Sequence, residues 1–541
     1  MKWMRDVLIG VCLTMLLTYF MRDLAIHGLP MFHDSNPHIA RAIAYHTALI
    51  DGQLPPMWAK ELLGGIGSPV LMLNYQLPYM LGELWHRLGA SIFDSYKLTL
   101  GITYIASGAF MYTALRTKFG RKAAWVGAII YSLAPYRFVD IYVRGALGEA
   151  MAFMFPPLLI MGWTKMSLPI LIVGWMGLFL THPTASALFS AFFLGYCVFV
   201  GKRDLIKPKL NLFASSFGIA LMIAAFNILP TLALTKFTYY SPALSDTFLM
   251  FPSLSQLIHF PWGYGVSLPG PNDGMSFELG LVLWLVLLGG TIWARKTKDK
   301  ELIYVSVTTW LMILLILPIS IPIYKIFGLS QFIDFPWRLL LCVVFGCAWI
   351  GAILVEKLKV IKIIKLLVIG ITVTMVVQAI PIAHTNKYWD VHKTEKFFSR
   401  ETGDSYGEYA PLTRATRDSS PFWKRIEFVS GSGEIETQIE KSNLQKYLIR
   451  TNEIGEVRIN TAYFPGWTIP SNCMVTERTL THIDDSGLIG CTVAKGEQIL
   501  EIKYEATPVQ KIGNLLTLAG IGVFIWISFQ SFYQRLMKKT R

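Results

Sequence analysis

The chain has 541 residues, of which 53% are hydrophobic and only 16% are charged, and its formal net charge is +14. Soluble domains carry roughly a quarter charged residues, and apolar stretches of membrane-span length recur along the chain, which excludes a soluble globular protein. The basic residues fall in short clusters between apolar segments, where membrane-orientation signals lie, so the charge does not indicate a nucleic-acid partner. The sequence therefore predicts a polytopic α-helical membrane protein.

About twelve apolar segments are long enough to be read as transmembrane helices. Lys2 and Arg5 precede the first, Val7 to about Ala25, and no small-x-small cleavage site follows it, so we expect an uncleaved first helix with a cytoplasmic N-terminus. Five later basic clusters (116–122, 202–209, 295–300, 357–365 and 535–541) then fall on the cytoplasmic side, as does the C-terminus. The further spans are expected near 94–115, 123–136, 148–164, 167–182, 184–200, 211–231, 276–294, 302–322, 337–355, 363–381 and 512–532.

Three long segments are predicted to face the outer side: about 28–94, 235–275 and 383–510. Prolines mark the outer ends of several spans, and irregular backbone at membrane depth is tolerated where it lines a cavity. We therefore expect a cavity at the outer membrane face. The predicted domains are a multi-span membrane domain (1–382), an extracytoplasmic β-rich domain (383–510), and a final helix with a basic cytoplasmic tail (511–541).

The third outer segment has the period of half-buried strands. Polar and apolar residues alternate over 434–440, 446–451, 456–463 and 498–505, and turn signals such as 431–433, 465–466 and 485–487 separate these runs. The pattern predicts an antiparallel β-sandwich. Cys473 and Cys491 lie within it on the oxidising side, where a disulfide would contribute about 3 kcal/mol; two free thiols are the alternative.

The first outer segment carries the most conspicuous polar motif, His33-Asp34-Ser35-Asn36-Pro37-His38-Ile39-Ala40-Arg41. Asp34 is a candidate general base for an acceptor hydroxyl, or a ligand of a divalent cation such as Mg²⁺ or Mn²⁺. His33 and His38 could adjust its pKa or bind a phosphate, and Arg41 is a further candidate phosphate ligand. The alternative is that Asp34 caps a helix that begins near Pro37.

A second group of charged residues lies at the outer end of a helical hairpin and at the start of a later span. Arg137, Asp140, Arg144 and Glu149 have near-helical spacing, which fits either phosphate or substrate contact or an interfacial ion-pair network. Arg338 follows Trp337 at an outer helix start and could bind phosphate or snorkel. His182 and His259 are weaker candidates, since a lone histidine near a helix end is usually structural.

Six segments together resemble a known family: HDSNPHIARAIAYHTALIDGQLPPMW (33–58), GGIGSPVLMLNYQLPYMLGEL (64–84), SLAPYRFVDIYVRGALGEAMA (132–152), FIDFPWRLL (332–340), GEYAP (407–411) and YFPGW (463–467). They look like the bacterial membrane proteins labelled 6-pyruvoyl-tetrahydropterin-synthase-related, which are not pterin synthases, with a tail similar to that of YfhO-like proteins. The group is similar to GT-C-type glycosyltransferases, which implies a GT-C-like membrane fold in the bacterial cytoplasmic (inner) membrane.

The resemblance implies hexosyl or pentosyl transfer from a polyprenyl-phosphate donor to a glycan, lipid or protein acceptor on the outer face. The essential acid of the first outer loop in that superfamily matches Asp34, and Arg137, Arg144 and Arg338 match its phosphate-binding residues by role. Many GT-C enzymes have paired acids there, whereas His33 and Ser35 flank Asp34. A transporter or flippase of lipid-linked glycans and a non-catalytic assembly factor are the alternatives. Ionisable groups gathered at the outer ends of spans, and not at mid-membrane, favour outer-face chemistry.

Overall fold

The computed structural model of the chain describes residues 2–200, 203–240, 247–268, 272–389, 409–413, 424–475 and 487–539. The turn predicted at 485–487, the basic clusters at 202–209 and 535–541 and the motif at 407–411 therefore fall partly outside the described residues. Residues 390–408, near the start of the predicted β-rich domain (383–510), lie outside them as well.

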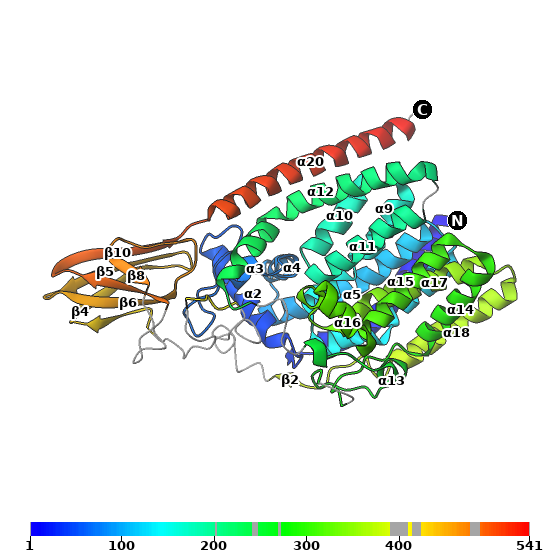
Figure 1. Cartoon of the computed structure of the whole chain (residues 1–541), viewed down its shortest axis with the longest axis horizontal. Coiled ribbons are helices and arrows are strands. Elements are labelled where there is room, and N and C mark those ends of the chain that lie inside the picture. The colour runs from blue at the N-terminus through cyan, green and yellow to red at the C-terminus, as the bar shows by residue number, and fades with distance from the viewer. Residues whose placement is uncertain are drawn as a thin grey trace.

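Helices make up the larger part of the molecule, and helical structure is present at each of the predicted spans (Figure 1). The helices that matter for the site are α1 (Lys2–Phe20), α2 (Ser35–Ile50), α3 (Val70–Leu73), α4 (Leu77–Arg87), α5 (Ile92–Arg116), α6 (Arg121–Leu133), α7 (Pro135–Phe138), the π-helical turn η2 (Val139–Arg144), α8 (Leu147–Ala152), α9 (Phe155–Lys165), α10 (Leu168–Phe179), α11 (Pro183–Phe199), α12 (Arg203–Leu234), α13 (Leu254–Ile258), α14 (Leu281–Thr297), α15 (Lys300–Ile316), α16 (Ile321–Phe327), η7 (Pro336–Leu339), α17 (Leu340–Lys357), α18 (Ile361–Ala379) and α20 (Pro508–Lys539).

Length and apolar composition identify a helical membrane protein. Among the described residues, 5 helices are long and apolar enough to cross a membrane, or up to 8 if each of three bent helix pairs forms one span. α10 and α11 are shorter apolar helices. The predicted number of about twelve spans therefore stays a prediction.

Prolines start the second half of two bent pairs. The axis bends by 48° between α6 and the segment that begins at Pro135, and by 89° between α15 and the segment that begins at Pro318. Proline lacks the N–H that would continue the helical ladder, so the chain changes direction there. Both bends lie where the sequence predicts irregular outer helix ends.

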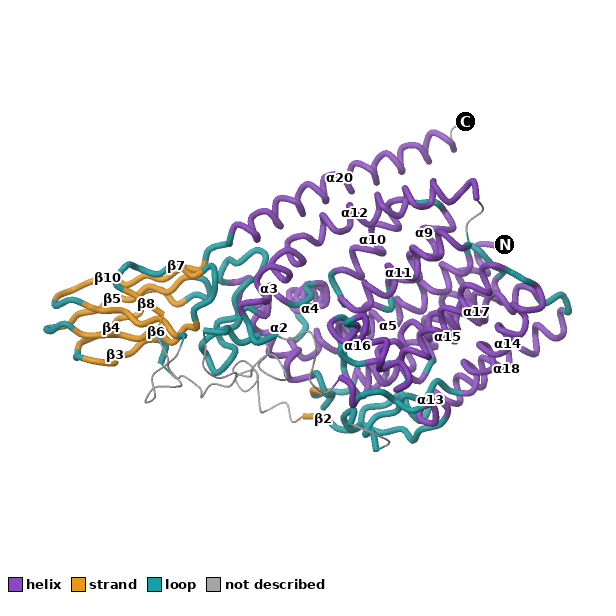
Figure 2. Tube along the Cα trace, viewed as in Figure 1, coloured by secondary structure: helices purple, strands orange, loops and turns teal. Residues whose placement is uncertain are grey.

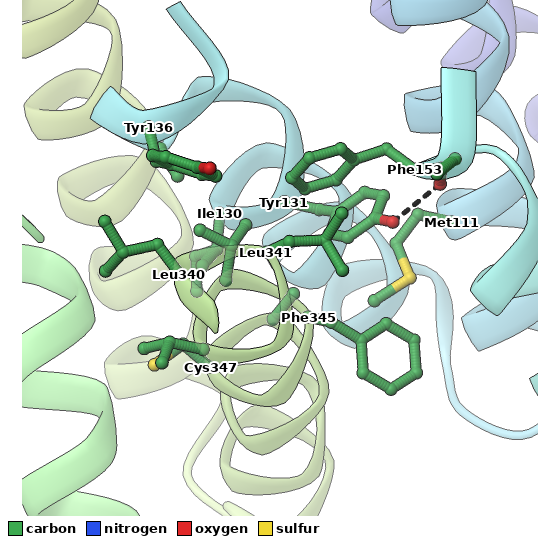
Figure 3. Packing of buried hydrophobic residues seen from close by; sticks show 14 of the residues in the cluster. Met111, Ile130, Tyr131, Tyr136, Phe153, Leu340, Leu341, Phe345 and Cys347 are labelled. Atoms are coloured by element: carbon green, nitrogen blue, oxygen red, sulfur yellow. Dashed lines mark hydrogen bonds between the residues drawn. The ribbon is translucent and has the colours of Figure 1, made fainter. Parts of the chain in front are cut away.

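The centre of the helical domain is packed around α6 and α17. Gly127 on α6 permits close approach, because a Cβ there would lie 2.9 Å from the Ala348 carbonyl oxygen on α17. Figure 3 shows the aromatic part of this core, in which the Tyr131 hydroxyl donates to the Phe153 carbonyl at 2.6 Å. This core holds the segments that carry the charged residues of the hairpin.

The β-rich domain consists of two four-stranded antiparallel sheets, ordered β4-β5-β10-β7 and β3-β6-β9-β8. Inward side chains of both sheets share one hydrophobic core, the arrangement of a sandwich (Figure 2). Cys473 and Cys491 pair directly across β8 and β9 and form a disulfide. The strands are β3 (Ile426–Ser430), β4 (Gly433–Glu440), β5 (Leu444–Thr451), β6 (Gly455–Ala462), β7 (Trp467–Thr468), β8 (Cys473–Val475), β9 (Leu488–Val493) and β10 (Gly496–Tyr504), with a separate pair of β1 (Leu29–Pro30) and β2 (Tyr388–Trp389).

The loop after α2 fastens the sandwich to the helical domain. Trp58 is fully buried and its ring lies 5.6 Å from that of Trp467 and 5.7 Å from that of Tyr504. The Ala462 N–H donates to the Ile66 carbonyl at 2.8 Å. On the other side, β10 leads directly into α20, which lies along α12 (Figure 1). The sandwich is therefore held next to α2, the helix that follows Asp34.

Candidate active site

A cavity of about 330 Å³ lies where the first outer loop, the charged hairpin and the starts of two later helices meet. Its wall combines acids, arginines and aromatic residues from segments far apart in the sequence. The spans that begin at Leu147 and Pro336, and the shorter helix that begins at Pro183, all start close to this wall, so their positive N-terminal ends are near the cavity. The lining residues are Asp34, Pro37, His38, Arg41, Asn74, Tyr75, Arg144, Ala146, Glu149, His182, Pro183, Thr184, Ala187, Tyr240, Gln331, Phe332, Asp334, Arg338 and Tyr409.

The backbone places Asp34 at the cavity wall. Its N–H donates to the Arg144 carbonyl at 2.8 Å, which joins the first outer loop to the hairpin. Asp34 occupies the N-cap position of α2, but its side chain makes no capping hydrogen bond. The Ser35 hydroxyl instead closes the turn, donating to the Pro30 carbonyl at 2.7 Å. The carboxylate of Asp34 is thus left to the cavity and forms no hydrogen bond or ion pair with another described residue.

The two histidines of the motif have different surroundings. His38 lines the cavity, is buried, and its Nδ1 lies 2.8 Å from the Tyr79 hydroxyl. Burial lowers the pKa of His38 to about 3, so it is neutral at physiological pH. His33 is not among the lining residues; its Nε2 donates to the Tyr264 carbonyl at 3.1 Å, and burial lowers the pKa of this ring too. His33 therefore ties the first outer segment to the second, and His38 contributes a neutral ring to the site.

Five charged residues of the hairpin and the η7 segment form a connected set, which we call the arginine–carboxylate network. Arg144 Nη1 lies 2.7 Å from Asp140 Oδ1 and 2.7 Å from Glu149 Oε2. Arg338 Nη1 lies 2.5 Å from Asp334 Oδ1, and its Nε lies 3.6 Å from the same Glu149 oxygen. The spacing of the hairpin residues left open whether they contact substrate or pair with one another. Asp140, Arg144 and Glu149 do pair. Arg144, Glu149, Asp334 and Arg338 also line the cavity.

Aromatic rings contact the guanidinium groups of Arg144 and Arg338. The Arg144 guanidinium lies 4.6 Å from the centre of the Trp337 ring, and that of Arg338 lies 5.0 Å from the Phe335 ring. Such cation–π contacts are attractive, and they restrict the conformations of the arginine side chains. Both arginines are therefore fixed before any ligand arrives.

Arg137, predicted to bind phosphate, is not among the residues that line the cavity. Its guanidinium is fully buried, lies 3.8 Å from the centre of the Phe153 ring, and donates to the Ser107 hydroxyl at 2.9 Å. Arg41 does line the cavity, beside the Tyr409 ring at 5.6 Å. Glu149, also grouped with the phosphate-binding candidates, has its carboxyl Oε2 2.7 Å from Arg144 Nη1, and this position makes it a partner of arginines.

Among the described residues, no group of three or more histidine, cysteine, aspartate or glutamate side chains could hold a metal ion. Mg²⁺ also binds through one or two carboxylates together with substrate phosphates, so a cation such as Mg²⁺ or Mn²⁺ at Asp34 stays a prediction.

Sequence reasoning missed Asp334 and ranked His182 low, although both line the cavity. Asp334 lies four residues before Arg338, the spacing of a helical ion pair, which was the available signal. Asn74 follows α3 in a segment of ordinary polarity, which gave no signal of its own. The fold and this cavity define a multi-helix membrane protein with a polar, ion-paired pocket beside a β-sandwich.

Comparisons with known proteins leave the family open. No family model matches the chain, and no curated protein matches it. Among solved structures, the arabinofuranosyltransferase AftD from mycobacteria is similar over 70% of this chain and 27% of its own length, with 10% sequence identity and a TM-score of 0.45. The chain thus corresponds to about a quarter of AftD, and a TM-score this low carries no weight for fold or function. The function proposed here therefore rests on the residues of the cavity.

Proposed function

We propose that this protein is a GT-C-like membrane glycosyltransferase, which moves a sugar from a polyprenyl-phosphate donor to an acceptor hydroxyl on the extracytoplasmic face. One observation carries the proposal. The carboxylate of Asp34, which makes no capping hydrogen bond, lines the same cavity as the guanidinium groups of Arg41, Arg144 and Arg338. A base and an anion-binding wall are the two requirements of this transfer.

In the proposed reaction, the acceptor oxygen attacks the anomeric carbon and its proton passes to Asp34. The bond between that carbon and the phosphate oxygen breaks, and the phosphate leaves with the bonding electrons, so the configuration at the carbon is inverted. Arg144 and Arg338 line the same cavity as Asp34, where they can neutralise the charge that develops on the leaving phosphate. The sandwich would engage the acceptor or cover the cavity.

The electrical character of the wall supports a phosphate more than a neutral ligand. Helix N-termini carry partial positive charge, and three helical segments begin at the cavity, at Leu147, Pro183 and Pro336. His38 is neutral, as its lowered pKa of about 3 indicates, and adds no charge to the wall.

The test is transfer from a panel of radiolabelled polyprenyl-phosphate sugars by the full chain in nanodiscs, comparing wild type with Asp34→Asn. Asp94→Asn is the matched control, since Asp94 also lies at a helix start but outside the cavity, where it pairs with Lys97 at 2.9 Å. We expect Asp34→Asn to lose about 100-fold or more in rate, the usual contribution of a general base, and Asp94→Asn to keep wild-type turnover.

Equal turnover in wild type and in a folded Asp34→Asn variant would refute Asp34 as the base. No transfer from any donor would favour the transporter or assembly-factor alternative. Thermal unfolding of all three proteins separates loss of chemistry from loss of fold.

A further inference from the structure

His182 occupies the N-cap position of α11 with extended backbone angles, φ −156° and ψ 110°. Its Nδ1 accepts a hydrogen bond from the Ala185 N–H at 3.2 Å. Only an unprotonated nitrogen can accept, so the ring is neutral and its single proton is on Nε2. The helix cap therefore fixes the tautomer, and it leaves Nε2–H as a donor.

That donor faces the cavity and has no hydrogen-bond acceptor within reach in the described part of the chain. His182 lines the cavity and is only 9% exposed. The nearest carboxylate oxygen is Glu149 Oε2 at 3.9 Å, beyond hydrogen-bond distance, and it is already occupied by Arg144 at 2.7 Å. The Nε2–H donor is open to the cavity, so a ligand that supplies an acceptor there can form a hydrogen bond with it.

The groups around His182 favour a ligand whose hydrogen-bond acceptor carries negative charge. α11 presents its N-terminal end here, and the Thr184 hydroxyl donates to the Phe332 carbonyl at 2.9 Å, which fastens this end to the segment that carries Arg338. Arg338 Nε is buried and has no hydrogen bond to a described residue. The His182 ring donor thus lies beside a helix N-terminus, in the same cavity as the Arg338 guanidinium.

We propose that His182 is a substrate-binding residue, whose Nε2–H donates to a phosphate oxygen of an isoprenyl-phosphate ligand. The inference rests on the proposed function for the lipid-linked nature of that phosphate. It adds a neutral donor to the arginines, and this donor does not depend on pH in the physiological range because the cap keeps Nδ1 unprotonated.

Two substitutions separate the cap from the ligand contact. Asparagine is among the best N-cap residues and can replace Nδ1, but it has no donor at the position of Nε2. Glutamine reaches the position of Nε2 with an amide N–H but is a poor cap. His182→Asn should therefore keep stability and lose affinity, whereas His182→Gln should lose stability and keep affinity.

The experiment measures binding of geranyl phosphate, geraniol and inorganic phosphate to the full chain in nanodiscs by calorimetry, together with thermal unfolding. For geranyl phosphate we expect His182→Asn to weaken binding about 10-fold or more, the value of one hydrogen bond to a charged group, at an unchanged unfolding temperature. His182→Gln should bind like wild type and unfold at a lower temperature.

Wild-type affinity in His182→Asn would overturn the proposal and leave His182 as a cap alone. Equal binding of geraniol and geranyl phosphate would overturn the phosphate contact, and equal binding of inorganic phosphate would overturn the lipid-linked assignment. Because the assay needs no sugar transfer, geranyl phosphate binding that depends on His182 in a protein without transferase activity would refute the proposed function and keep this inference.

Discussion

Glu149 is the residue on which the arginine–carboxylate network depends, and Glu149→Gln tests that dependence. The side chain is 2% exposed; Oε1 accepts from the Tyr136 hydroxyl at 2.5 Å and Oε2 from Arg144 at 2.7 Å. Glutamine has almost the same shape and can keep one hydrogen bond to each neighbour, since the Tyr136 hydroxyl is able to accept from an amide as well as donate. The substitution therefore removes charge with little change in packing.

The expected cost follows from which partners remain. Removing one member of a buried ion pair costs roughly 3–5 kcal/mol because it leaves an uncompensated charge. Arg144 keeps Asp140 at 2.7 Å and Arg338 keeps Asp334 at 2.5 Å, so neither guanidinium is left alone. We expect Glu149→Gln to lower the free energy of unfolding by about 3 kcal/mol, the lower end of that range.

Unfolding by sodium dodecyl sulfate in mixed micelles, followed by tryptophan fluorescence, measures the change. The matched control is Glu434→Gln on β4, whose side chain is 75% exposed and 3.6 Å from Arg450. A surface pair of this kind contributes about 0–1 kcal/mol. If Glu149→Gln unfolds at the same detergent fraction as Glu434→Gln, the network does not hold the two arginines and the electrostatic reasoning above is wrong.

Two further predictions follow from the positions of Arg137 and His38. Arg137→Met should leave the affinity for geranyl phosphate unchanged and the stability unchanged or higher. Replacing a buried, poorly paired charge by an apolar group is often neutral or stabilising. Weaker binding of geranyl phosphate in calorimetry would show that Arg137 contributes to the site. Burial lowers the pKa of His38 from 6.5 to about 3, so below about pH 6.5 the unfolded chain takes up a proton that the folded chain does not, and stability falls as the pH falls. His38→Gln should remove that part of the slope, and parallel pH profiles of unfolding for the two proteins would contradict the buried, neutral ring.

The elements that could be predicted from sequence are those with a local period. Each predicted strand is present with an end shift of at most two residues, as for 446–451 against β5 (Leu444–Thr451). β3 (Ile426–Ser430), β7 (Trp467–Thr468), β8 (Cys473–Val475) and β9 (Leu488–Val493) were not predicted. β7 and β8 have only two or three residues and show no period, and β9 is a mostly apolar run without strict alternation. The number of spans was harder to predict, because composition alone does not show whether a bent helix pair crosses the membrane as one span.

Part of the site could be predicted from residue type. The different positions of Arg137 and Arg144 have a geometric cause. Arg137 and Arg144 are seven residues apart, so an uninterrupted α-helix would place both on one face. The chain instead passes from α7 into the wider π-helical turn Val139–Arg144, which shifts the later side chains around the axis. Arg144 therefore faces the cavity while Arg137 points into the core beside Phe153.

The balance of charge in the cavity explains why its arginines are paired with acids. In the proposed reaction one negative charge leaves Asp34, which gains a proton, and one appears on the phosphate, whose ester bond to the sugar breaks. Guanidinium groups already fixed by Glu149 and Asp334 need no rearrangement when that charge develops, and such preorganisation favours the transition state over the bound donor. An open cluster of unpaired arginines would bind the donor as tightly as the transition state and gain no rate. In the proposed reaction, Glu149 and Asp334 would thus contribute to the rate by fixing the two guanidinium groups.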